Sequence, residues 1–231
     1  MASFGYEGTE QPHSGASDFN AVSFVIAQAL ARLNISAVVK VVAVTDPGGV
    51  NPSGTVDVTP LVNQLDAARN AIPHGVIYSM PYFRLQGGAN AIIITPEVGD
   101  IGIAVFSDRD ISSVKATKKR ANPGSLRRFD MADGMYLGGL LNGTPTQYVQ
   151  FSPAGIRVHS PTAVILEAPD VQILAATVEI NATASVTMTT PVFQLNGRMA
   201  ATGDIVAVGT SLHTHTHGGV AAGGASTGAP N

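Results

Sequence analysis

Residues 155–197 read GIRVHSPTAVILEAPDVQILAATVEINATASVTMTTPVFQLNG, and this stretch decides the fold class of the C-terminal half. Pairs of apolar residues, separated by one position, recur along it every seven or eight residues: Ile156/Val158, Val164/Leu166, Val171/Ile173, Val178/Ile180, Val186/Met188 and Phe193/Leu195. Side chains alternate between the two faces of a strand, so each pair places two apolar groups on one face and a middle residue on the other. Turn-prone residues such as Ala168-Pro169-Asp170 separate the pairs. The pattern predicts short β-strands joined by corners.

Such a repeat cannot enclose a core by itself, because each strand supplies only two apolar side chains. Two architectures solve this problem: a single-chain solenoid, and an intertwined β-prism in which three chains each supply one face. The Val, Thr and Pro content and the apolar-x-apolar pattern disfavour a coiled coil. Residues 145–231 hold only six charged side chains: Arg157, Glu167, Asp170, Glu179, Arg198 and Asp204. This low charge favours the trimer, which hides apolar groups and strand edges between chains.

The N-terminal part predicts one helix followed by a small β-barrel. Asp18 precedes FNAVSFVIAQALARLN (19–34), whose apolar residues recur at helical spacing, and Asp18 is the expected N-cap with Asn34 as the stop. Strand-like runs follow in 35–46, 54–64, 75–88 and 90–108, with turn sequences at Asp46-Pro47-Gly48-Gly49 and Gly87-Gly88. Four or five short antiparallel strands fit a barrel of the oligonucleotide/oligosaccharide-binding (OB) type, with other small barrels or sandwiches as alternatives. The expected fold class of the whole chain is all-β.

The composition excludes several classes of function. The 231 residues are 45% apolar and 13% charged, and a formal net charge of −3 argues against a general nucleic-acid binder. The absence of cysteine excludes disulfides and thiolate metal sites. No apolar run approaches the ~20 residues of a membrane span, and MASFGYEGTE lacks the basic segment of a secretory signal.

Basic side chains gather between Asp110 and Asp130, a segment without any acid: Lys115, Lys118, Lys119, Arg120, Arg127 and Arg128. Six like charges are compatible with an anionic partner, but a solvated connector is the favoured interpretation. Tyr78, Tyr82 and Phe83 are available for stacking on bases, yet the strands carry few cations, so a structural barrel without nucleic acid is expected. No catalytic pattern stands out, and the protein is not expected to be an enzyme.

Three histidines alternate with threonine near the C-terminus, at His213, His215 and His217. On an extended strand all three imidazoles would face one side. Two histidines from each of three chains would supply six nitrogens, an octahedral set that suits iron or nickel better than zinc. Three per chain would supply nine, too many for one ion, so one histidine is not expected to ligate.

The HTHGGV…GGxSTGxP ending, preceded by the β-prism repeat and the N-terminal barrel, resembles the membrane-piercing central spike proteins of contractile-tailed bacteriophage baseplates. The resemblance implies an OB-fold domain, a trimeric intertwined β-helix and an iron-bearing apex. In that family an HxH pair binds the ion just before a Gly-rich turn, which places the ligands on His215 and His217. The additional His213 leaves a 213/215 pair open. The implied cofactor is one Fe²⁺ per trimer, held by six histidine nitrogens.

The implied function is mechanical: the spike caps the tail tube and is driven through the host outer membrane when the sheath contracts. The resemblance implies a homotrimer whose N-terminal domain faces the tail hub and whose apex meets the outer membrane. The expected location is the distal tip of the baseplate in the virion, after synthesis in the host cytoplasm, with entry into the host envelope during infection. The alternative is a trimeric β-helical tail protein that binds or degrades surface polysaccharide, for which the four acids of the shaft are thin support.

The expected organisation has five parts: an N-terminal arm and helix (1–35), an OB-fold barrel (36–111), a basic connector (112–144), an intertwined β-helix shaft (145–209) and a metal-binding apex (210–231).

Overall fold

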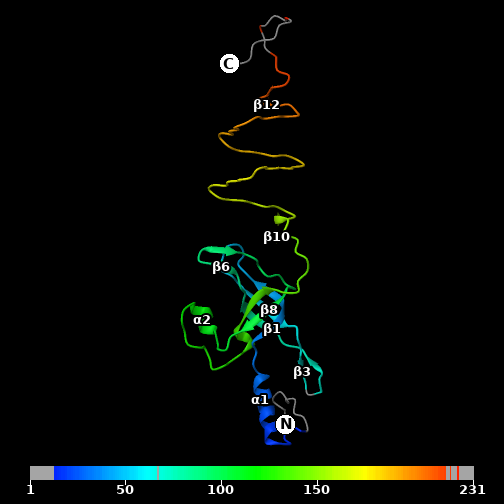
Figure 1. Cartoon of the computed structure of the whole chain (residues 1–231). Helices are drawn as coiled ribbons and strands as arrows, with labels where there is room; N and C mark the ends of the chain where they lie inside the picture. The colour runs from blue at the N-terminus through cyan, green and yellow to red at the C-terminus, as the bar shows by residue number, and fades with distance from the viewer. Residues whose placement is uncertain (1–12, 67, 217–218, 220–222, 224–231) are drawn as a thin grey trace. The chain divides into compact units, whose positions relative to one another are not determined.

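The computed structural model describes residues 13–66, 68–216, 219 and 223 (Figure 1). It is mostly β with few helices, which agrees with the predicted class. The chain divides into two compact units, Met1–Ile165 and Leu166–Asn231. This division lies beyond residue 144, where the charge density changes, because the hairpin of β10 (Tyr148–Ser152) and β11 (Gly155–His159) belongs to the first unit. Among the described residues, no helix is both long and apolar enough for a membrane span.

Helix α1 (Asp18–Leu30) begins one residue earlier than predicted. Its N-cap is Ser17, whose hydroxyl accepts a hydrogen bond from the backbone N–H of Asn20 at 3.2 Å. Asp18 is therefore the first helical residue, where its carboxylate faces the positive end of the helix dipole. The helix ends at Leu30 rather than Asn34, and the side-chain amide of Asn34 donates to the carbonyl of Phe129 at 2.9 Å. The helix buries no residue, so its apolar stripe is left uncovered by the described part of the chain.

The first unit is built on one antiparallel sheet with the strand order β5-β2-β1-β8-β9. The five strands are β1 (Ser36–Thr45), β2 (Thr55–Pro60), β5 (Ile77–Pro81), β8 (Ile101–Phe106) and β9 (Gly134–Gly139). A bridge between Tyr82 and Tyr136 brings the two edges of the sheet together, and the N–H of Phe83 donates to the Tyr136 carbonyl at 2.7 Å. The sheet is therefore curled.

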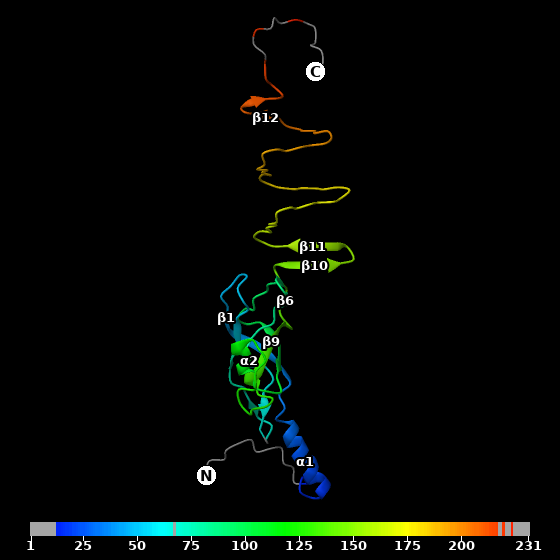
Figure 2. The same cartoon turned by 90° about the vertical axis from the view of Figure 1, so that its left-hand side faces the viewer.

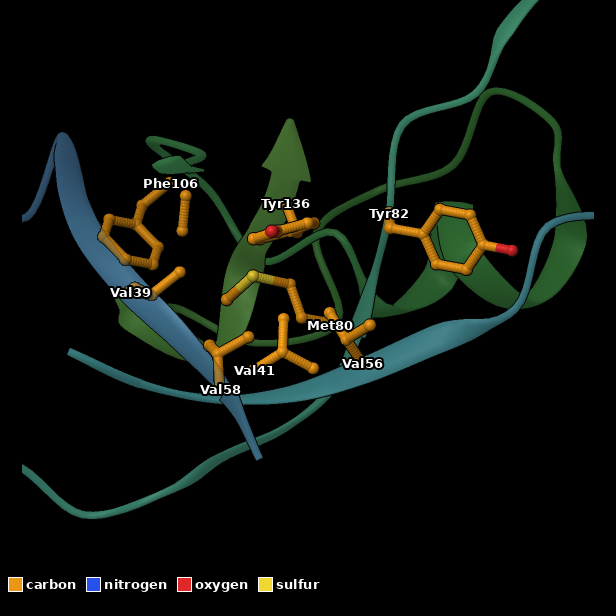
Figure 3. Packing of buried hydrophobic residues seen from close by; sticks show 9 residues of the cluster. Val39, Val41, Val56, Val58, Met80, Tyr82, Phe106 and Tyr136 are labelled. Carbon is orange, nitrogen blue, oxygen red and sulfur yellow. The ribbon is translucent and has the colours of Figure 1, made fainter. Parts of the chain in front are cut away.

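The inward faces of these strands make the core (Figure 3). Strand β2 alternates strictly, with Val56, Val58 and Pro60 buried and the residues between them half-buried. Met80 lies between Val41 and Tyr136 in Figure 3. The buried cluster consists of Val39, Val41, Val56, Val58, Met80, Tyr82, Ala104, Phe106 and Tyr136. Each buried Val or Met side chain contributes about 1.5–3 kcal/mol by leaving water, so this small core holds the curled sheet together.

The predicted turns form where turn residues permit them. After β1, the carboxylate of Asp46 accepts hydrogen bonds from the N–H of Gly48, at 2.7 Å, and from the Tyr82 hydroxyl. These two bonds hold the pKa of Asp46 below its ordinary value. Gly88, with a φ of 58°, turns the chain between β6 (Leu85–Gly87) and β7 (Asn90–Ile92). A second short hairpin pairs β3 (Gln64–Leu65) with β4 (Ala71–Ile72).

The basic segment forms a closed loop between β8 and β9. It contains the short helix α2 (Ser112–Thr117) and ends in the 3-10 helix η1 (Met131–Asp133). Lys118 caps α2 in the left-handed region, with a φ of 54°.

In the second unit, residues 166–205 contain no helix or strand. Within this range the chain runs back and forth in successive segments (Figure 2). Beyond it, β12 (Val206–Ala207) pairs with β13 (Thr210–Ser211) in a two-residue hairpin. The turn of this hairpin holds Val208 and Gly209, both with positive φ.

Candidate functional site

Polar side chains of the repeat pair with partners two residues away. The amide of Gln172 donates to Asp170 at 2.7 Å, and the amide of Asn181 donates to Glu179 at 2.8 Å. Farther along, Gln194 donates to Asn196 at 3.2 Å. Contacts between residues i and i+2 are typical of an extended chain, where such residues share a face. The middle residues of three predicted apolar pairs thus lie beside other polar groups, as the alternation predicts.

The apolar side chains of the repeat are not covered by their own chain. Every residue from 161 to 210 is exposed, and Ile173 keeps 71% of its surface accessible. Among the described residues, no backbone–backbone hydrogen bond joins residues 166–204 to one another. Exposed apolar side chains and unpaired main-chain N–H and C=O groups over such a length are unfavourable for a single chain in water.

The apex begins with a hairpin that is tied by Asp204 and Ser211. The Asp204 carboxylate accepts a hydrogen bond from the backbone N–H of His213 at 3.1 Å. The Ser211 hydroxyl also accepts from this N–H, at 3.1 Å, and from the N–H of Thr214 at 2.8 Å. Hydrogen bonding by Ser211, and then by the backbone of His213 and Ile205, holds the pKa of Asp204 below its ordinary value.

These hydrogen bonds bend the start of the histidine segment. The sequence predicts that His213 and His215 are alternate residues of one extended strand. In the structure Leu212–Thr214 form a turn instead, so the two histidines do not share a strand face. Both side chains are exposed. The turn forms because Ser211 and Asp204 take up the backbone N–H groups that a strand would offer to a neighbour. His217 lies outside the described residues.

His215 is held against the carbonyl oxygen of Ser211. Its backbone N–H donates to this oxygen at 3.2 Å, and its ring Nδ1 lies 3.0 Å from the same atom. A ring nitrogen that faces a carbonyl carries the proton, and the lone pair of a neutral imidazole then resides on Nε2. Metal-binding histidines commonly donate their other ring N–H to a backbone carbonyl in this way, and imidazole is a donor that suits iron. Among the described residues, no group of three or more His, Asp or Glu side chains is placed to hold an ion.

The first unit uses part of its basic run internally. Arg127 forms ion pairs with Asp133 at 2.6 Å and with Asp110 at 3.1 Å, and both carboxylates are buried. Hydrogen bonds from Ser112 and Ser125, with the charge of Arg127, lower the pKa of Asp110 to about 2. The sequence pattern did not separate Arg127 from its neighbours, because its partners lie outside the acid-free segment. The one feature of the sequence that could have indicated these ion pairs is that Asp110 and Asp133 lie on either side of the basic segment.

Residues 209–231 match the family model of the GpV Apex motif. The match begins at Gly209, the second residue of the β12–β13 turn, and covers β13, the three histidines and the Gly-rich end of the chain. No curated protein matches the chain.

Proposed function

We propose that this chain caps a contractile tail tube and pierces the host outer membrane. The apex motif supports this proposal, because it indicates a phage baseplate central spike protein of the gpV type. The GpV spike family is structural, and its apex motif is known for metal binding at the spike tip. A phage spike motif also implies a tail location in the virion. Beyond these family properties, we propose for this chain the piercing step, a homotrimer, iron as the metal, and a position at the distal tip of the baseplate.

The observation that carries the proposal is the uncovered repeat. Residues 166–205 expose their apolar side chains and lack a hydrogen-bonding ladder of their own, although their polar side chains already pair along the chain. Three copies wound around one axis supply the missing partners: the apolar face of each chain turns inward and the main chains pair between copies. An intertwined β-helix of this kind has few free strand edges.

The first unit fits the part of a spike that faces the tail hub. Its curled five-stranded antiparallel sheet is compatible with an OB-fold barrel. Helix α1 presents an uncovered apolar stripe, with Phe19 78% exposed, which is suited to contact with another protein. The hub is therefore the proposed partner of this unit, and the host outer membrane is that of the apex.

The metal is proposed to join the three chain ends. His215 and His217, from each of three chains, provide the six imidazole nitrogens of an octahedral Fe²⁺ site. The contact between His215 Nδ1 and the Ser211 carbonyl presents Nε2 as the ligand atom. A pair formed by His213 and His215 is the other possible set. The ion would supply cross-linking and no redox step.

Low charge suits the mechanical role. Residues 145–231 carry six charged side chains, so an assembled shaft offers few ionic groups that must be desolvated as it crosses a bilayer. The polysaccharide alternative would need a pair of carboxylates at catalytic separation, and the four acids of the shaft are thin support for it.

The proposal is tested by native mass spectrometry of the purified full chain, combined with elemental analysis. The expected result is a trimer that resists SDS without heating and carries one iron per three chains. A monomer at micromolar concentration would overturn the architecture. A trimer expressed with iron, never exposed to chelator and yet free of transition metal, would overturn the apex site alone.

A further inference from the structure

The basic segment concentrates positive charge, and most of its cations have no acidic side chain nearby in the sequence. Residues 111–129 contain six of the 13 basic side chains, and all 16 acidic side chains lie outside this range. The structure divides the six into three groups. Arg127 is neutralised by Asp110 and Asp133, and the guanidinium of Arg128 lies 5.8 Å from the centre of the Phe129 ring. The remaining four cations share one site.

Lys115, Lys118, Lys119 and Arg120 line an open hollow of about 630 Å³, which we name the basic hollow. Its other wall is formed by the segment Pro52–Thr55 together with Pro81. Within the described part of the chain, the ion pairs join Arg109 to Asp108 and Arg127 to Asp110 and Asp133, and none of them involves these four cations. The hollow therefore presents positive charge to an outside partner.

The fold holds this surface in place. Asp110 accepts hydrogen bonds from the N–H of Ser112 at 2.8 Å and from the Ser125 hydroxyl at 2.7 Å, which fastens both ends of the loop. The ammonium group of Lys115 donates to the Ser79 carbonyl at 3.1 Å and ties α2 to β5. The backbone that carries the four cations is therefore already held before a partner binds, which lowers the entropy cost of binding.

We infer that the basic hollow binds an acidic segment of a partner protein, with Asp or Glu side chains on the four cations and apolar groups against the two prolines. No aromatic side chain lines the hollow, whereas single-stranded nucleic acids are usually held by stacking on aromatics. The net charge of −3 also disfavours a long polyanion, because all 16 acidic side chains lie outside the basic segment. A short acidic segment meets only the cations.

The inference rests on the proposed function only for the identity of the partner, since the first unit would then offer the hollow to an acidic surface of the tail hub. Binding itself is independent of the spike assignment. Oligomeric mass and iron content, measured on the same samples, separate a failure of the hollow from a failure of the proposed function.

The test is fluorescence anisotropy of the full-length protein with two labelled probes, a glutamate decapeptide and a single-stranded oligothymidine of equal charge. The expected result is saturable peptide binding that weakens as salt increases. The double variant Lys118→Glu/Lys119→Glu should lose about tenfold or more in affinity, because each reversal places like charge against the probe. Both positions are exposed, and an unchanged thermal midpoint in scanning calorimetry verifies that the first unit still folds.

Arg128→Glu is the matched control, since it reverses a cation of the same loop that does not line the hollow. It should change peptide affinity by less than about twofold. Equal losses in the control and the double variant would overturn the inference, as would the absence of peptide binding at low salt. Tighter binding of the oligothymidine, lost in the double variant, would also overturn it and assign the hollow to nucleic acid.

Discussion

The guanidinium of Arg127 holds the carboxylate of Asp133 through two hydrogen bonds, 2.6 Å from Nε to Oδ2 and 2.8 Å from Nη2 to Oδ1. Asp133 is only 1% exposed and is the last residue of η1, directly before β9, while Arg127 lies near the end of the basic loop. This bidentate pair joins the loop to the curled sheet. Because its charge is neutralised by the buried acids, Arg127 does not contribute to the positive surface of the basic hollow.

Replacement of Arg127 by alanine should destabilise the first unit. It leaves two buried carboxylates, Asp110 and Asp133, without their cation, and such groups are costly to keep ionised. The thermal midpoint should fall by about 5 °C or more in scanning calorimetry. Arg128→Ala removes an exposed cation from the next position and should lower the midpoint by less than about 2 °C. Equal shifts would show that the ion pairs contribute nothing.

Acid should release the basic loop. The pKa of Asp110 is lowered to about 2, and that of Asp133 is also lowered, mainly by hydrogen bonds from Arg127. A carboxylate whose folded pKa lies below its unfolded value stabilises the fold above that unfolded value, near 3.9, and loses this effect as the pH falls toward the folded pKa.

Hydrogen exchange of a peptide covering residues 109–130, corrected for the intrinsic rate, should therefore be constant between pH 7 and 5. Protection should disappear between about pH 4 and 2. The amides to follow are those of Ile111 and Ser112, which donate directly to the two carboxylates. Loss of protection already at pH 6 would contradict this account.

The shaft register can be tested at two adjacent positions. If three chains wind with Ile173 facing the axis, Ile173→Asp places three carboxylates in an apolar interior and should abolish the trimer. Gln172 lies on the opposite face, where it donates to Asp170, so Gln172→Asp should leave the trimer intact. Light scattering gives the mass of both variants. Equal effects would mean that the alternation of the repeat has been assigned to the wrong faces.

The metal ligands can be separated by single substitutions. His215→Ala and His217→Ala should each remove the iron while the trimer persists, because in the proposed trimer the apex lies beyond the intertwined shaft. His213→Ala should retain about one metal per three chains. If His213→Ala removes the metal and His217→Ala does not, the ligand pair is His213 and His215. Acidification to about pH 5 should also release the ion, since only neutral imidazole ligates.

Asp204 should act on the metal site without contacting the ion. It accepts the N–H of His213 and hydrogen-bonds Ser211, whose carbonyl faces His215 Nδ1. Asp204→Ala should weaken metal affinity about 10- to 100-fold in chelator competition, the range typical when a residue that orients a metal ligand is removed. Asp170→Ala is the matched control, because Asp170 accepts a hydrogen bond from Gln172 and lies far from the apex in sequence. Unaltered affinity in Asp204→Ala would remove this residue from the site.

Local rules were sufficient for much of the first unit. Alternation in Thr55–Pro60 predicts a strand with one buried face, and Asp46-Pro47-Gly48-Gly49 predicts the turn that the Asp46 carboxylate closes. The helix start was misplaced by one residue, because Ser17 and Asp18 are both good caps and only the hydroxyl of Ser17 reaches the N–H of Asn20. These features depend on neighbours within a few positions, which a sequence displays directly.

The sequence by itself determined the β class, the positions of most strands in the first unit, and an apolar repeat that its own chain leaves uncovered. Tertiary structure alone decided the strand order β5-β2-β1-β8-β9, the closure of the sheet between Tyr82 and Tyr136, and the withdrawal of Arg127 from the basic run. It also decided the bend of the histidine segment. This bend depends on the hydrogen bond from the His213 N–H to Asp204, which lies nine residues earlier in the chain. Alternation and turn chemistry act between near neighbours, whereas these contacts join residues whose separation along the chain leaves no periodic trace.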